Sequence, residues 1–182
     1  MLDIETGGKP NWDKRSLILS IGLVKFTYKG IGETLYLKPD LVSQIREGFL
    51  PTRDTIAWWN TQPEEVFNES WLSPRDTIDH CITSITDFVD KYDKIWVKGA
   101  EFDYPIISAF FQVFGHEVPW YYTNLYCMRC IREFFSSDEL SIDTSKIKHT
   151  ALEDAIDQAN YVIKAKQLSG LWPKLDENPI NP

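Results

Sequence analysis

Asp3-Ile4-Glu5-Thr6, close to the start of the chain, is predicted to lie in a β-strand. Successive side chains of a strand point to opposite faces, so Asp3 and Glu5 share one face, about 6 to 7 Å apart along the strand. Two carboxylates this close repel each other unless cations lie between them. Magnesium and manganese ions prefer oxygen ligands, so the pair is predicted to form half of a cage for two divalent ions. Solvated surface acids are the alternative for an Asp-x-Glu triplet taken alone.

A further acidic position, Asp103, follows the apolar run Ile95-Trp96-Val97-Lys98-Gly99. This run predicts a short strand that ends at a glycine and is followed by a helix. In an open α/β sheet, functional sites gather at the carboxyl ends of strands, which is where Asp103 falls. Because Asp103 lies two residues before Pro105, a helix N-cap is the favoured alternative for this residue alone, and the two roles are compatible.

Asp154 lies near the start of a strongly amphipathic helix, and His149 precedes it in a predicted loop. A five-residue offset would place the two side chains about 140° apart on a continuous helix, so both reach one site only if His149 precedes the helix. With an unperturbed pKa of about 6.5, histidine is the side chain best suited to accept a proton at neutral pH. A solvated surface histidine is the alternative, although neither His80 nor His116 has a matching carboxylate arrangement.

In this order, the motifs at residues 3–6, 102–103 and 149–154 resemble those of the DEDDh 3′-5′ exonucleases. That superfamily includes proofreading polymerase subunits, oligoribonuclease and RNase T. Residues 55–62 and 97–103 are similar to segments of the phage DexA-type exodeoxyribonucleases and of related small bacterial 3′-5′ exoribonucleases. The resemblance runs from residue 1 to about residue 168. It implies an RNase H-like fold, two Mg²⁺ or Mn²⁺ ions, and release of nucleotides from a free 3′ end.

The resemblance also assigns roles to individual residues. Asp3, Glu5, Asp103 and Asp154 match the metal-binding carboxylates, and His149 matches the general base that takes a proton from the attacking water. The expected mechanism is therefore two-metal hydrolysis of the terminal phosphodiester bond.

Five residues are candidates for substrate binding. Thr6 and Gly7 match positions beside the terminal sugar in the resembling family. Trp58 is a candidate for stacking on a base, with packing in the core as the favoured alternative. Lys146 and Lys148 lie just before the histidine and are the best candidates for phosphate contact, ahead of Lys98, although solvated loop lysines are at least as well favoured.

The chain departs from the family pattern in two places. Only Met1 and Leu2 precede Asp3, whereas several apolar residues usually precede this aspartate in the family. Fraying of so short a strand would leave one ligand poorly held. Residues 123–126 fall where DexA-type proteins tend to have an Asp-containing segment, and we expect this difference to affect a supporting interaction.

The predicted fold is an α/β fold with an RNase H-like mixed sheet and helices on both faces. Strands at residues 2–6, 17–26 and 34–37 predict an antiparallel three-stranded meander, and later strands are expected to be parallel. Residues 1–172 are predicted to be a single exonuclease domain, and residues 173–182 an irregular tail. Helices are predicted over residues 41–59, with breaks at Gly48 and Pro51, over 73–90, from Pro105, over 124–135, and over the final amphipathic segment.

Composition suits one domain: 43% of the 182 residues are hydrophobic, enough for a substantial core. No apolar run reaches the length of about 18 residues that a transmembrane helix needs, and residues 1–15 are too polar for a signal peptide. We therefore expect a cytoplasmic protein without membrane contact. The chain has three cysteines, and Cys127 and Cys130 have zinc-like spacing without a second ligand pair, so two buried helical cysteines are expected instead.

The net charge of −8 argues against long duplex as the main substrate. Two divalent ions would add a charge of about +4 where a phosphate must sit, so the 3′ end of single-stranded DNA or RNA is the expected partner. The choice between DNA and RNA stays open, because contacts to the 2′ hydroxyl cannot be located from spacing. Related small exonucleases often dimerise, which makes a homodimer a further expectation.

Two other functions are compatible with parts of the pattern. An exonuclease fold can bind a 3′ end or a protein partner without cutting, and a missing ligand would have favoured this non-cleaving module. An endonuclease of the RNase H type also uses two metals. The setting of His149 resembles the exonuclease branch and disfavours the endonuclease.

Overall fold

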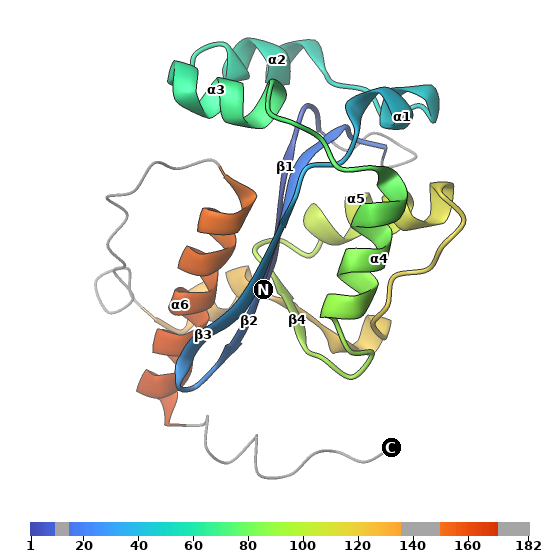
Figure 1. Ribbon diagram of the computed structural model, residues 1–182. Helices are drawn as coiled ribbons and strands as arrows, with labels where there is room; N and C mark the ends of the chain where they lie inside the picture. Colours follow the sequence, from blue (N-terminus) through green and yellow to red (C-terminus); the bar gives the residue numbers. More distant parts are fainter. Residues whose placement is uncertain (10–14, 136–149, 171–182) are drawn as a thin grey trace.

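The computed structural model describes residues 1–9, 15–135 and 150–170, and it shows a mixed α/β fold (Figure 1). Three strands form an antiparallel sheet in the order β1-β2-β3, and two further strands pair in parallel. This arrangement confirms the predicted fold class and is consistent with an RNase H-like fold. The strands are β1 (Leu2–Thr6), β2 (Ile18–Thr27), β3 (Gly30–Leu37), β4 (Ile95–Val97) and β5 (Leu125–Cys127).

Helices cover both faces of the antiparallel sheet (Figure 1). The long helix α6 (Ala151–Ser169) packs along one face, against all three strands of the meander. On the other face, α4 (Ile78–Phe88) contacts β3 and α5 (Asp103–Val113) contacts β1. The shorter helices α1 (Leu41–Arg46), α2 (Arg53–Trp59) and α3 (Glu64–Trp71) gather at one end of the sheet. None of the helices in the described part of the chain could cross a membrane.

The short first strand is paired along its full length. Asp3 lies opposite Gly22 and Glu5 lies opposite Ser20 in β2. The pairing continues to Met1, whose carbonyl oxygen accepts a hydrogen bond of 2.9 Å from the backbone of β2. Fraying therefore does not loosen the strand, and both acidic residues project from one face of a fixed backbone.

Gly22 lets the start of α6 approach the sheet at the residue opposite Asp3. A Cβ atom at Gly22 would overlap the carbonyl group of Ala151 and would lie 2.5 Å from the backbone nitrogen of Leu152. The first turn of the helix therefore rests directly on the strand backbone. This close contact brings Asp154, which lies in that first turn, to the acidic face of β1.

The contact predicts that Gly22→Ala displaces α6 and destabilises the protein by about 1 to 3 kcal/mol, the usual cost of an overpacked core. Urea denaturation would measure the change in the free energy of unfolding. Gly32→Ala is the matched control, because Gly32 is an exposed strand residue whose added Cβ would meet its nearest neighbour at 3.3 Å. Equal stability of the two variants would show that α6 does not depend on this close approach.

Two predicted helices differ from the structure because contacts distant in sequence take precedence over the local pattern. The helix predicted from residue 73 begins at Ile78, since Asp76 is held against the end of β3. The backbone nitrogen of Asp76 donates to the carbonyl of Lys38 at 2.8 Å, and its carboxylate accepts from the Lys38 nitrogen at 2.8 Å. The helix predicted over 124–135 is replaced by β5, which pairs with β4, and by short 3₁₀ segments.

The predictions for residues 41–59, for the cysteines and for the C-terminal tail have different outcomes. The break of the 41–59 region into two helices is confirmed, and Gly48 lies between them with a φ of 84°. Helix α3 was not predicted. The expectation of two buried helical cysteines is wrong, because Cys127 is half-buried at the end of β5 and Cys130 is exposed on a 3₁₀ turn. The predicted tail at 173–182 lies outside the described residues.

Candidate active site

Three of the predicted metal ligands lie together on the α6 side of β1. Asp3 and Glu5 come from the strand and Asp154 comes from the first turn of α6. One carboxylate oxygen of each lies within 4.8 Å of the others, and they are the only group of three potential metal ligands among the described residues. Asp3 is buried, and Glu5 and Asp154 are half-buried. The residues converge because strand alternation aligns two of them and close helix docking adds the third.

Asp103 lies beside this group, at the start of α5. It is 4% exposed, and its Oδ2 accepts a hydrogen bond of 3.4 Å from the backbone nitrogen of Gly99. The helix N-cap is Phe102, so the alternative of Asp103 as the cap is wrong. Asp103 is not part of the compact group of three, yet its carboxylate raises the pKa of Asp3.

Burial disfavours ionisation of these carboxylates, and mutual repulsion adds to the effect at Asp3 and Glu5. Burial raises the pKa of Asp3 well above its ordinary value, and repulsion from Asp103, Glu5 and Asp154 adds to the effect. Burial, followed by repulsion from Asp154, raises the pKa of Glu5 to about 8. Burial also raises the pKa of Asp103 to about 6. Bound divalent cations would remove this repulsion, and a set of carboxylate oxygens is the ligand type that Mg²⁺ and Mn²⁺ prefer.

Two further side chains, Gln158 and Lys98, influence the carboxylates. The sequence had not assigned either of them to this site. Gln158 lies one helical turn after Asp154, and its Nε2 donates a hydrogen bond of 2.6 Å to Oδ1 of Asp3. A polar residue four positions from Asp154, on the otherwise apolar face of α6, is the signal that would have pointed to it. Lys98 is exposed at the end of β4, and its charge lowers the pKa values of Glu5 and Asp103 against the effect of burial.

The segment at Thr6 and Gly7 is anchored by internal hydrogen bonds. The carbonyl oxygen of Thr6 accepts from Trp59 Nε1 at 2.9 Å, and its hydroxyl donates to the carbonyl of Gly8 at 2.8 Å. The Gly7 nitrogen donates to a carbonyl in the segment preceding β2 at 2.8 Å, and its carbonyl accepts from Thr52 at 2.9 Å. These bonds fix the end of β1, and contact with a terminal sugar stays a prediction.

The adjacent tryptophans of α2 have different surroundings. Trp59 is fully buried, whereas Trp58 is 43% exposed, and their rings meet edge to face at 5.0 Å. The alternative that both pack in the core is wrong for Trp58. Its accessible indole fits the predicted base contact, which itself stays a prediction.

His149, Lys146 and Lys148 lie outside the described residues. Thr150 is the N-cap of α6: its backbone is extended and its hydroxyl accepts a hydrogen bond of 3.3 Å from Glu153. The helix that carries Asp154 therefore begins after position 149, as the predicted arrangement requires.

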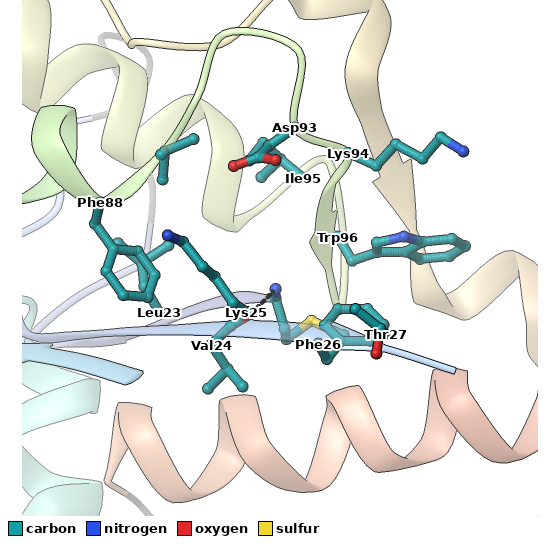
Figure 2. A pocket seen from close by; sticks show the side chains of 12 residues that line it. Leu23, Val24, Lys25, Phe26, Thr27, Phe88, Asp93, Lys94, Ile95 and Trp96 are labelled. Carbon is teal, nitrogen blue, oxygen red and sulfur yellow. Dashed lines mark hydrogen bonds between the residues drawn. The ribbon is translucent and has the colours of Figure 1, made fainter. Parts of the chain in front are cut away.

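A separate pocket of about 270 Å³ lies where the start of β1 meets the second half of β2 and β4 (Figure 2). Figure 2 shows Lys25 and Phe88 at one side of it and Trp96 at the other. None of the four carboxylates lines this pocket. The acidic group and the pocket are therefore distinct features of the fold.

One family model matches most of the chain. The model for the 3′-5′ exoribonuclease Rv2179c-like domain matches residues 1–165. The match begins before β1 and extends through most of α6, so it includes all four carboxylates. No curated protein has significant similarity to the chain.

Proposed function

The chain belongs to the family of Rv2179c-like 3′-5′ exoribonuclease domains, and we propose that it removes nucleotides from the 3′ end of single-stranded RNA by metal-dependent hydrolysis. The observation that carries this proposal is the convergence of Asp3, Glu5 and Asp154 within 4.8 Å. The family description names RNA, and this favours RNA over DNA as the substrate.

We propose that these three carboxylates, together with Asp103, hold two Mg²⁺ or Mn²⁺ ions. Such ions, when bound, supply positive charge that stabilises the attacking and leaving oxygens of an in-line phosphoryl displacement. The protein contributes fixed ligand positions: β1 is paired along its length, and α6 is docked against it at Gly22. Rigid placement matters because ligands must stay close to their productive geometry.

His149 is proposed as the general base that accepts the proton of the attacking water. A residue just ahead of α6 is close in sequence to Asp154, and an imidazole titrates in the pH range where a base is needed. The start of α6 after position 149 supports this role. The DexA-type and DEDDh assignments stay predictions at this level of detail.

Five residues are proposed to contact the substrate. Trp58 would stack on a base, an interaction that contributes about 1 to 3 kcal/mol in single-strand binders. Lys146 and Lys148 would contact phosphate, and the Thr6–Gly7 segment would lie beside the terminal sugar. Binding only a few nucleotides suits a chain with a net charge of −8, because such a short binding site needs few phosphate contacts. A homodimer is also proposed.

The direct test uses one sequence as RNA and as DNA, each labelled at the 5′ or the 3′ end. With Mn²⁺ or Mg²⁺, 5′-labelled RNA should shorten in single-nucleotide steps, and 3′-labelled RNA should release a labelled mononucleotide first. EDTA should stop both reactions, and matched DNA should react more slowly. Internal cleavage products would favour an endonuclease. Binding without digestion under either metal would favour the non-cleaving module.

A further inference from the structure

Gln158 is a polar residue on the buried face of α6. It is 6% exposed and lies close to Ala155 and Ala159, both fully buried. A buried primary amide needs hydrogen-bond partners, because an unsatisfied polar group costs about 1 to 3 kcal/mol. A leucine or methionine would suit the apolar side of this helix better. Packing alone therefore does not explain why an amide side chain occupies this position.

The amide is only half satisfied. Its Nε2 donates to Oδ1 of Asp3 at 2.6 Å, whereas its buried Oε1 has no hydrogen-bond partner among the described residues. A network with one unmet acceptor is a poor source of stability. The bond to Asp3 is therefore the feature that distinguishes glutamine from an apolar residue here.

The bond connects two elements of the acidic group. Asp154 and Gln158 lie four residues apart on α6, so one helix face supplies one carboxylate and a donor to another carboxylate on β1. The donor is neutral. A lysine or arginine at this position would hold the same carboxylate but would add a positive charge that competes with a bound cation. A neutral amide can orient the carboxylate without that competition.

We propose that Gln158 is a positioning residue for the metal ligand Asp3. By holding Oδ1, Gln158 fixes the rotation of the Asp3 carboxylate. The other oxygen of this carboxylate is then left directed toward the other acidic side chains. Partners that orient a metal ligand typically change metal affinity by about 10 to 100-fold when removed. This inference rests on the proposed metal binding and extends it to a residue that is not a ligand.

The test compares the Mn²⁺ affinity of the unchanged full chain with that of its variants. The electron paramagnetic resonance signal of free Mn²⁺ measures how much of the ion stays unbound. The variants are Gln158→Leu and Gln158→Met, which keep the approximate volume and remove the donor. Gln167→Leu is the matched control: Gln167 is an exposed glutamine on the same helix, and it donates to the Tyr28 carbonyl at 3.2 Å. Both Gln158 variants should bind Mn²⁺ about 10 to 100-fold more weakly, and the control should bind like the unchanged protein.

A second measurement separates positioning from a structural role. In EDTA, the Gln158 variants should unfold at a urea concentration close to that of the unchanged protein, because removal of the unsatisfied Oε1 offsets the loss of the hydrogen bond to Asp3. Lower metal-free stability with unchanged Mn²⁺ affinity would overturn the proposal. If the unchanged protein bound no Mn²⁺, both this inference and the proposed function would fail. Binding by the unchanged protein and equally by the variants would overturn the inference alone.

Discussion

Asp154→Asn is expected to lower exoribonuclease turnover by more than about 100-fold, because loss of even an outer partner of a metal ligand costs roughly 10 to 100-fold. The amide has nearly the volume of the carboxylate, so α6 should stay docked. Removing the charge also relieves the repulsion that raises the pKa of Glu5. The metal-free variant should therefore unfold at a urea concentration no lower than that of the unchanged protein at neutral pH.

Asp157→Asn is the matched control for this change. Asp157 is a half-buried residue on the same helix and is not part of the acidic group. Single-turnover digestion of 5′-labelled RNA would give the rates, and circular dichroism would verify the fold. Near-normal turnover of Asp154→Asn with Mg²⁺ would remove Asp154 from the proposed ligand set. A comparable loss in Asp157→Asn would show that the effect is not specific to the acidic group.

The place of each acidic side chain on its strand or helix could be predicted from a local pattern, whereas their assignment to one metal site came from the resemblance to the DEDDh exonucleases. Strand alternation alone places Asp3 and Glu5 on one face. The apolar stripe of α6 predicts a helix that docks on the sheet, with Asp154 in its first turn. Asp103 follows the glycine, Gly99, that comes shortly after β4. In each case a local pattern places the residue on its element, and the resemblance of the ordered motifs to those of the DEDDh exonucleases implied that the residues share one site.

Features that depend on tertiary contact were not predicted. Gly22 has no local signal, since its importance comes from the carbonyl of Ala151 that lies against it. Gln158 gains its role only when α6 packs across β1. Residues 124–135 contain a helical pattern, but Leu125–Cys127 pairs with β4 because parallel pairing outweighs a weak local preference. Long-range packing determines these outcomes, and a single sequence does not show it.

The stability of the metal-free protein is expected to depend strongly on pH. Glu5 has its pKa raised from 4.5 to about 8 in the folded protein, and Asp103 from 3.8 to about 6, with Asp3 shifted in the same direction. Between the unfolded and folded values, the folded state binds more protons than the unfolded state. Stability therefore falls as pH rises through this range, by at most about 1.4 kcal/mol per pH unit for each such carboxyl.

One group opposes this trend. The amino group of Met1 is buried, and its pKa is lowered from 8.0 to about 5, so its contribution to stability rises with pH over the same window. Because more carboxyls than amino groups shift here, urea denaturation in EDTA should show lower stability at pH 7.5 than at pH 5. Glu5→Gln isolates the acidic group, since it removes one carboxyl with a raised pKa and leaves the amino group in place. It should be close to the unchanged protein at pH 5 and clearly more stable at pH 7.5.

Added Mn²⁺ should reverse the effect in the unchanged protein. A cation that binds the folded state stabilises it according to its concentration and affinity. Binding requires ionised carboxylates, so fewer protons must be displaced as pH rises, and the stabilisation by Mn²⁺ should be larger at pH 7.5 than at pH 5. Glu5→Gln should lose most of this response. If Mn²⁺ stabilised both proteins equally, the ion would be binding elsewhere, and the carboxylates of β1 and α6 would have to be interpreted as a strained acidic group without a metal.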